Sequence, residues 1–290
     1  YDKHVDEFLD FVTCGDKEIR ANIEEMLGHI LWTRGFSHKV FFLVNSSGKN
    51  GKSTFLKMVS NFVGEPTSKL SIDAFDDSTL LSSLDGKLVN LGDAIYWDKT
   101  KNFKTIASGD TITIRAIYSH GFELTNRASL IFTANRMPTF KDKTGGLERR
   151  IQIIPFNAHV TKPNPNLDKQ LSAENAKSYL LNLALQGLER LQSNNGELTK
   201  STVIEEATQE YFTRSDSFKS FMSEFNIEGN SGDQTYKMYE QYCDVEGFIR
   251  PVSKRTFVDK CRDMGFELKK QFKEVKGKQV LITEYTRKEE

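Results

Sequence analysis

The segment from Lys39 to Gly64 constrains the fold of this chain more than any other. The apolar run "KVFFLV" (39–44) leads into "NSSGKNGKST" (45–54), and "FLKMVSNFVG" (55–64) follows. In this last stretch the apolar residues recur at helical spacing, and Gly64 is a typical helix end. A buried strand, a Gly-rich loop and an amphipathic helix in this order predict a phosphate-binding loop.

The loop departs at one position from the pattern G-x-x-x-x-G-K-[ST], because Ser46 stands where the first glycine is expected. Lys52 is spaced to reach the β- and γ-phosphates, and Ser53 offers a hydroxyl to Mg²⁺. The alternative is a Gly/Ser turn that opens an ordinary helix, which the flanking strand and helix disfavour. The residues predicted to bind ATP and Mg²⁺ are Ser47, Gly48, Lys49, Asn50, Gly51, Lys52, Ser53 and Thr54.

Three more apolar runs have the length of buried strands: "KLVNLGD" (87–93), "ASLIFTAN" (128–135) and "RRIQIIPF" (149–156). Strands that alternate with helical patterns predict an α/β fold with a mainly parallel central sheet. Between the first two runs, "TITIRAIYSHGFELT" (111–125) alternates apolar and polar residues on both sides of Ser119–Gly121, which predicts a β-hairpin.

Polar residues at the strand ends are candidates for the rest of a nucleotide site. Asp93 is the predicted carboxylate for Mg²⁺, because P-loop enzymes need an acid at the end of a neighbouring strand. Ala94 follows where many such enzymes have a second acid, so Glu123 and Asp98 are candidate helpers. Asn135 is spaced to meet the γ-phosphate or the attacking water. The plainer alternatives are a turn-capping Asp and an Asn in a turn.

Arg149 and Arg150 follow the flexible "KTGG" and open the last of these strands. An arginine supplied by a neighbouring subunit can stabilise the charge of a phosphoryl-transfer transition state. Arg149 is the first candidate for this role and Arg150 the alternative. A basic pair at the surface is the plainer interpretation.

Breaker-rich joints divide the chain into four predicted regions. Apolar residues at three- and four-residue steps predict a helical region over 1–38, followed by the strand-rich core over 39–157. The Pro/Asn-rich "NAHVTKPNPN" leads into helices over 158–230, expected at about 168–192 and 200–227, and "GNSGD" precedes a module over 231–290. In that module, helices and a strand pair around "KGK" predict a winged helix.

Composition is that of an ordinary globular protein, with zero formal net charge. No apolar run approaches the ~20 residues of a membrane span, and the N-terminus has no signal-peptide pattern. The three cysteines (Cys14, Cys243, Cys261) lack metal-type spacing and indicate reduced thiols, hence a cytoplasmic location. Residues 250–288 hold 12 Lys/Arg against 5 Asp/Glu, an excess of +7 that fits either a polyanion-binding surface or a solvated face.

With these motifs in order, the chain resembles the helicase part of the phage and plasmid primase–helicase family, in superfamily III of the AAA+ helicases. It is also similar in layout to the poxvirus primase–helicase. The resemblance covers residues 20–290. It rests on "FFLVNSSGKNGKSTF", "GKLVNLGD", "KTIASGDTITIRAIY", "LIFTANRMPTF", "GGLERRIQIIPF" and "YEQYC…SKRTF…MGFE".

The resemblance implies a ring, usually a hexamer, that closes around single-stranded DNA and moves 3′→5′ with ATP between subunits. It also implies roles for single residues: Lys52 and Ser53 as the P-loop pair, Asp93 as the metal acid, Lys104 in the following motif, Asn135 as the γ-phosphate sensor and Arg149 as the finger. At the hairpin tip it implies DNA contacts, for which Arg115, Tyr118 and His120 are the candidates here. Lys254 and Arg255, at the start of the winged helix's second helix, are further candidates for DNA contacts.

The predicted function is therefore an ATP-dependent DNA helicase that replicates a phage, a plasmid or another mobile element. Because the first residue is Tyr1, a fragment is expected, with a primase or initiator region upstream. One alternative is a replication initiator that binds DNA and uses ATP as a switch without processive unwinding, which the missing acid at Ala94 favours. Another is an AAA+ protein remodeller, which the hairpin and the basic C-terminus disfavour.

Overall fold

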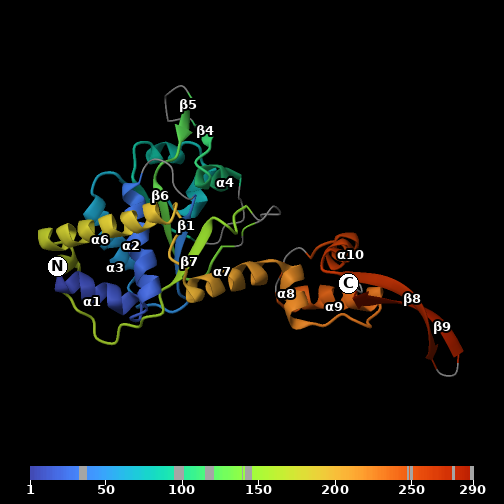
Figure 1. Cartoon of the computed structure of the whole chain (residues 1–290). Coiled ribbons are helices and arrows are strands. Elements are labelled where there is room, and N and C mark those ends of the chain that lie inside the picture. Colours follow the sequence, from blue (N-terminus) through green and yellow to red (C-terminus); the bar gives the residue numbers. More distant parts are fainter. Residues whose placement is uncertain are drawn as a thin grey trace. The chain divides into compact units, whose positions relative to one another are not determined.

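The computed structural model describes residues 1–32, 38–94, 101–114, 121–138, 140, 146–246, 248, 251–275 and 278–287. The described chain forms two compact units, Tyr1–Gln209 and Glu210–Glu290 (Figure 1). The boundary between them falls inside helix α7 (Thr202–Ser215). The finer division into four regions remains a prediction.

The centre of the first unit is a parallel sheet, which in the described residues has five strands in the order β2-β3-β6-β1-β7. Its strands are β1 (Val40–Val44), β2 (Thr67–Ser68), β3 (Val89–Asp93), β6 (Ser129–Ala134) and β7 (Ile151–Pro155). Almost every residue of β1 and β6 is buried, as expected for parallel strands covered on both faces. The prediction of an α/β fold with a mainly parallel central sheet is confirmed.

Helices and a separate hairpin surround this sheet (Figure 1). They are α1 (Lys3–Val12), α2 (Lys17–Leu31), α3 (Lys52–Val63), α4 (Lys101–Ala107), α5 (Leu167–Leu171), α6 (Glu174–Ser193), the short 3₁₀ helices η1 (Ile72–Asp76) and η2 (Leu80–Leu84), and the antiparallel strands β4 (Thr111–Ile114) and β5 (Phe122–Thr125). One continuous core joins Phe41 of β1 and Phe55 of α3 to apolar residues of α1, α2 and α6.

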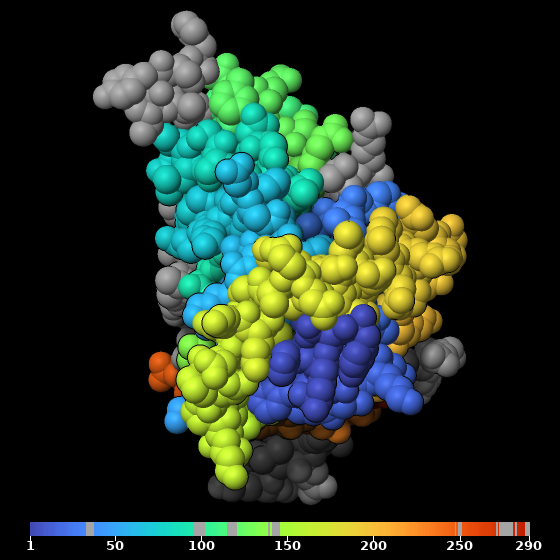
Figure 2. All heavy atoms as spheres, turned by 90° about the vertical axis from the view of Figure 1, so that its left-hand side faces the viewer, coloured from blue at the N-terminus to red at the C-terminus, as the bar shows by residue number. Residues whose placement is uncertain are grey.

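The N-terminal helices and α6 form one packed layer, in which the blue helices lie against the yellow-green α6 (Figure 2). Helices α2 and α6 cross at Gly28 and Gly187, where a Cβ on Gly187 would stand 2.0 Å from the carbonyl oxygen of Glu24. Arg190 of α6 donates to Glu24 at 2.8 Å and to the fully buried Glu25 at 3.2 Å. Backbone contact and part-buried ion pairs therefore join segments more than 150 residues apart in sequence.

The second unit consists of α8 (Ser217–Glu224), α9 (Gly232–Val245), α10 (Lys254–Asp263) and the antiparallel pair β8 (Phe266–Val275) and β9 (Lys278–Arg287). Its core is aromatic and includes Phe218, Phe221, Tyr239, Phe257 and Tyr285. The order of elements agrees with the predicted C-terminal module, and its assignment as a winged helix remains a prediction. Within the described residues, none of the helices combines the length and apolarity that crossing a bilayer requires.

Two helices predicted as continuous are interrupted. The segment 168–192 contains α5 and α6, which separate at Ser172–Ala173, and the segment 200–227 contains α7 and α8. The second break occurs at Asp216, whose side chain accepts hydrogen bonds from the backbone N–H groups of Phe218 and Lys219. A side chain in this position caps the start of a new helix, so the chain changes direction there.

Candidate nucleotide-binding site

The Asn45–Gly51 loop joins the carboxyl end of β1 to α3 and contains a backbone conformation that favours glycine. Gly51, the N-cap of α3, has φ of 85°. This left-handed conformation is strained for residues with a Cβ. A Cβ there would also stand 2.9 Å from Cγ1 of Val12. The second glycine of the motif is thus required both by its dihedral angle and by packing against α1.

The side chains of two asparagines form hydrogen bonds that hold the loop in its conformation. Oδ1 of Asn45 accepts from the N–H and the hydroxyl of Ser47, both at 2.6 Å, while its Nδ2 donates to the carbonyl of Phe156 at 2.8 Å. The buried Asn50 donates to the carbonyl of Ser47 at 2.5 Å. Sequence reasoning did not identify Asn45 as a structural residue of the site. The signal for it was an Asn two residues before Ser in a turn, where the side chain mimics a backbone turn.

Lys52 starts α3 and turns its side chain back toward the sheet. Its Nζ donates to the carbonyl of Asn45 at 2.8 Å and to Oδ1 of Asn135 at 3.1 Å. Only 7% of Lys52 is exposed, and this burial lowers the pKa of its ammonium group. Within the described part of the chain this ammonium group forms no ion pair with a carboxylate. An anionic ligand at the loop would supply the opposite charge.

Asp93 lies at the end of β3, opposite Thr133 of β6. The Thr133 hydroxyl donates a hydrogen bond to Oδ1 of Asp93, and the N–H of Ala94 donates to the Thr133 carbonyl at 2.8 Å. The Asp93 side chain is otherwise exposed at the edge of the sheet. Thr133 was not identified from the sequence. It becomes recognisable once the register of β3 against β6 is known.

Lys52, Asp93 and Asn135 lie at one edge of the sheet, because β3, β6 and β1 are neighbouring parallel strands that all end there. Crevices outside the carboxyl ends of parallel strands are the usual ligand sites of α/β folds. The first turn of α3 opens toward this edge without a side-chain cap, and Ser53 is exposed beside it.

The donors at this edge suit a nucleotide triphosphate with Mg²⁺. Uncapped N–H groups at a helix N-terminus and a buried ammonium group favour phosphate, while a hydroxyl and a carboxylate favour Mg²⁺. The loop residues Ser47–Thr54 would hold the phosphates, and Ser53 and Asp93 would hold the metal. Asn135 accepts a hydrogen bond from the same ammonium group at 3.1 Å, so its side chain lies beside Lys52 at this edge.

Arg149 and Arg150 lie at the opposite edge of the sheet. The Arg150 carbonyl accepts from the N–H of Val40, the first residue of β1, at 2.8 Å. The loop begins after the fifth residue of that strand. A five-residue strand is about 16 Å long at about 3.3 Å per residue. The Arg149 side chain is exposed, and the Arg150 guanidinium donates to the carbonyl of Gly146, beside Lys104. The structure therefore does not bring either arginine to the loop of its own chain.

The other predicted residues are distributed as follows. Arg115, Tyr118 and His120 of the hairpin tip, and the candidate helper Asp98, lie outside the described residues. Glu123 is on β5, opposite Thr113, and so belongs to the separate hairpin and not to the five-stranded sheet. In the second unit, Lys254 forms an exposed ion pair with Asp233, and Arg255 is exposed in the first turn of α10.

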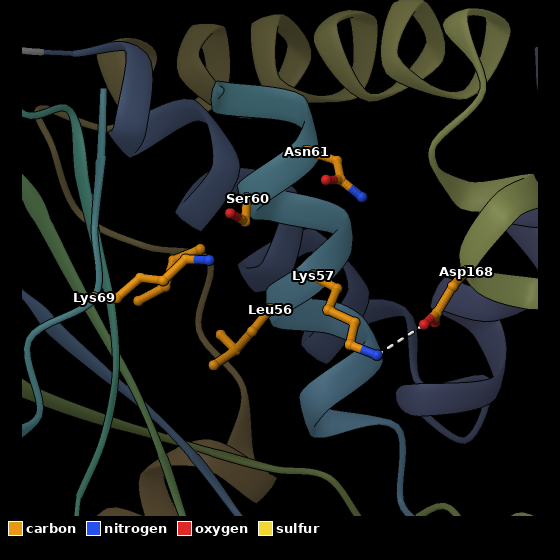
Figure 3. A pocket seen from close by; sticks show the side chains of 7 residues that line it. Leu56, Lys57, Ser60, Asn61, Lys69 and Asp168 are labelled. Atoms are coloured by element: carbon orange, nitrogen blue, oxygen red, sulfur yellow. Dashed lines mark hydrogen bonds and ion pairs between the residues drawn. The ribbon is translucent and has the colours of Figure 1, made fainter. Parts of the chain in front are cut away.

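A separate hollow lies along α3 and is lined by Leu56, Lys57, Ser60, Asn61, Lys69, Leu91 and Asp168 (Figure 3). Its Lys57 pairs with Asp168 at 2.8 Å, as the dashed line in Figure 3 marks. The hollow lies beside the body of α3 and does not include the loop or the residues around Lys52. Because one of its two lysines is already neutralised, it is a weaker candidate for phosphate than the loop.

Lys52, Asp93 and Asn135 all lie within the segment that matches a known family model. Residues 43–150 match DUF5906, a family of unknown function. An alignment of 160 positions, which covers 51% of the chain, is 27% identical to a protein of Acanthamoeba polyphaga mimivirus named "Putative helicase L207/L206". The alignment covers 16% of the viral protein, so the chain spans only a small part of this relative's length.

The solved structures that resemble the chain include two apo structures of the C-terminal region of NrS-1. One has a TM-score of 0.62 at 16% identity and covers 98% of this chain and 75% of the NrS-1 chain. The other has a TM-score of 0.61, also at 16% identity, and covers 98% and 76%. At this identity the likeness establishes the fold, which is shared over nearly the whole chain.

Proposed function

We propose that this chain is the motor part of an ATP-dependent DNA helicase. The observation that carries the proposal is the convergence of Lys52, Asp93 and Asn135 at the carboxyl ends of three neighbouring strands. The similarity to a viral protein named as a helicase supports the same function. The resemblance to phage and plasmid primase–helicases further suggests replication of a mobile element.

Each group at the edge has a distinct task in this proposal. The Asn45–Gly51 loop and the first turn of α3 bind the phosphates through backbone N–H groups, and Lys52 neutralises their charge. Bound Mg²⁺ would neutralise the phosphate oxygens further. Asp93 holds the metal with Ser53, and its hydrogen bond from Thr133 fixes its orientation. Asn135 orients the attacking water or the terminal phosphate.

The site is incomplete in one copy if a finger arginine is required, because Arg149 and Arg150 lie at the other edge of the sheet. In a head-to-tail ring two different surfaces of neighbouring subunits meet, so this edge of one subunit can face the loop of the next. This geometry supports the proposal of a ring, with six subunits and 3′→5′ movement taken from the family resemblance. Single-stranded or forked DNA would pass through its centre, near the β4–β5 hairpin.

The direct test compares the unchanged protein with Lys52→Ala on a forked DNA substrate. Lys52→Ala removes the only side chain that bridges the loop and Asn135 among the described contacts. We expect loss of ATP hydrolysis and of strand displacement, with an unchanged circular-dichroism spectrum. Normal unwinding by this variant would refute the proposal.

The same assay distinguishes the helicase from a replication initiator. An initiator that uses ATP as a switch would bind the fork and hydrolyse ATP slowly, without displacing a strand. DNA-stimulated hydrolysis together with strand displacement supports the helicase. A protein remodeller would hydrolyse ATP without stimulation by DNA.

A further inference from the structure

The β8–β9 hairpin of the second unit has an apolar face that extends past the core. Directly opposed residues of an antiparallel pair share a face, as do residues two apart on one strand. Phe266, Leu268 and Tyr285 therefore share one face, on which Leu268 lies opposite Tyr285. All three pack in the aromatic core of this unit. This half of the hairpin is needed to close the fold.

The same face continues with the pair Phe272 and Leu281, which lie opposite each other four residues beyond the Leu268–Tyr285 pair. Phe272 is 67% exposed and Leu281 is 50% exposed. Neither belongs to the core cluster of the unit. A large aromatic side chain with an aliphatic partner across the strand pair is thus exposed to solvent, outside the core of the unit.

Positive charge accompanies this exposed pair. Lys269 and Lys270 are both exposed on the approach to it, and Lys270 lies on the same face as Phe272. From Lys269 to Leu281 the sequence has five lysines and one acidic residue, Glu274. Lys269 pairs with Glu267 at 3.2 Å, a surface ion pair that competing phosphate can displace.

We propose that the described residues around the exposed pair, Lys269, Lys270, Phe272 and Leu281, bind single-stranded nucleic acid, with Phe272 stacked on a base and Lys269 and Lys270 on the flanking phosphates. An exposed aromatic ring among cationic side chains is the chemistry by which proteins hold unpaired strands. A duplex keeps its bases stacked inside and offers no free face to Phe272. A second copy of the chain is a poorer occupant, because lysine is depleted in protein interfaces and Lys269 and Lys270 would repel their copies.

This contact is independent of the proposed ATPase, because it belongs to the second unit and requires no nucleotide. The experiment therefore measures equilibrium binding of the full chain by fluorescence anisotropy, without ATP. Two probes of equal length and charge distinguish base stacking from phosphate contacts. They are a thirty-residue oligothymidylate and an abasic strand with the same phosphates. A failed ATPase would leave this measurement unaffected.

Phe272→Ala should weaken binding of the oligothymidylate on the order of tenfold and leave the abasic strand unchanged, because only base stacking is lost. Phe272→Trp should retain the wild-type affinity. Replacing Lys269 and Lys270 together by Ala should weaken the binding of both probes. It should also reduce the slope of log K against log salt concentration by about 0.7 for each lost phosphate contact. Val245→Ala, at another exposed apolar position (82%), is the matched control and should change neither.

Three results would overturn the proposal. Phe272→Ala could bind oligothymidylate as the unchanged protein does, which excludes stacking. It could weaken the binding of both probes equally, which indicates a change in fold and not the loss of a base contact. It could leave binding intact but lower the molar mass in light scattering, which would assign the Phe272–Leu281 pair to a contact between copies.

Discussion

At the scale of single residues, the Thr133 hydroxyl donates a hydrogen bond to Asp93, the carboxylate that we propose as the metal ligand. The adjacent position is Ala94, so Asp93 alone supplies the carboxylate at the end of β3. A carboxylate held by a hydroxyl keeps one oxygen in a fixed place and presents the other outward. Groups that orient a metal ligand commonly contribute 10–100-fold to metal affinity or activity.

Thr133→Val should therefore raise the Mg²⁺ concentration needed for half-maximal ATP hydrolysis by about tenfold or more. Valine has the same shape as threonine, so packing within β6 is retained while the donor is lost. Thr133→Ser keeps the hydroxyl and should restore most of the affinity. The measurement is a Mg²⁺ titration of hydrolysis at saturating ATP, and equal titrations for Val and Ser would contradict the positioning role.

Gly51→Ala tests the loop's backbone. The left-handed φ of 85° costs a residue with a Cβ about 1–2 kcal/mol, and the close approach of Val12 adds to it. We expect a lower free energy of unfolding in urea together with weaker nucleotide binding. Gly15→Ala is the control, because Gly15 also has positive φ (74°) but an added Cβ meets nothing within 4 Å. If both variants lose equal stability, the contact with Val12 contributes nothing.

The residues of the candidate site differ in how visible they were in the sequence. Lys52 belongs to a contiguous motif, and Asp93 and Asn135 each end an apolar run, so local pattern was enough to propose all three. Thr133 and Asn45 act through partners 40 and 111 residues away. Their roles depend on strand order and register, which no local pattern encodes.

At the scale of secondary-structure elements, the α2–α6 crossing depends on glycine. A Cβ on Gly187 would meet the Glu24 carbonyl at 2.0 Å, so Gly187→Ala must push the helices apart. Helix propensity alone predicts the opposite sign, a gain of up to about 1 kcal/mol. We expect a net loss of about 1–3 kcal/mol in chemical denaturation, as overpacked cores show. Ser178→Ala, exposed on the same helix, should be nearly neutral.

The ion pairs between α1 and α2 make the first unit sensitive to acid. The hydrogen bond from Arg20 holds the pKa of Asp6 below its usual value, with a 2.6 Å contact between them. The folded state thus binds the proton less tightly than the unfolded chain. The stabilisation is present above the unfolded pKa of about 3.9 and is lost as pH falls through the lower folded pKa. In urea titrations at several pH values, Asp6→Asn should reduce the fall in the free energy of unfolding at low pH. An unchanged pH dependence would exclude the Asp6–Arg20 pair as the cause of this fall.

The elements themselves were largely predictable, because buried parallel strands are continuous apolar runs and the long helices are amphipathic. The exceptions follow from weak local signals. Strand β2 has only two residues, too few for any pattern. The helix breaks near Ser172 and Asp216 come from capping, which overrides periodicity at a single position. The strand order is set by tertiary packing and was not available from the sequence.

At the scale of the whole molecule, the parallel sheet separates two parts of the proposed mechanism. The Asn45–Gly51 loop follows the carboxyl end of β1, while Arg149 precedes the amino end of β7, which pairs with β1 in parallel. Because β1 and β7 are paired in parallel, the length of these strands separates Arg149 from the loop within one chain. A finger role for Arg149 would therefore require the loop of a second copy of the chain, as in the proposed ring.

Mixing two inactive variants tests this arrangement. Lys52→Ala lacks the phosphate lysine and Arg149→Ala lacks the finger, so each alone should hydrolyse almost no ATP. In a randomly mixed ring at equal amounts, about a quarter of the interfaces join an intact Lys52 to an intact Arg149. Hydrolysis should recover to about that fraction of the wild-type rate. A parallel mixture with Arg150→Ala identifies which arginine acts, since only the true finger variant is inactive alone and complemented in the mixture. If the subunits exchange, as native mass spectrometry can establish, and no activity returns, neither arginine acts across the interface.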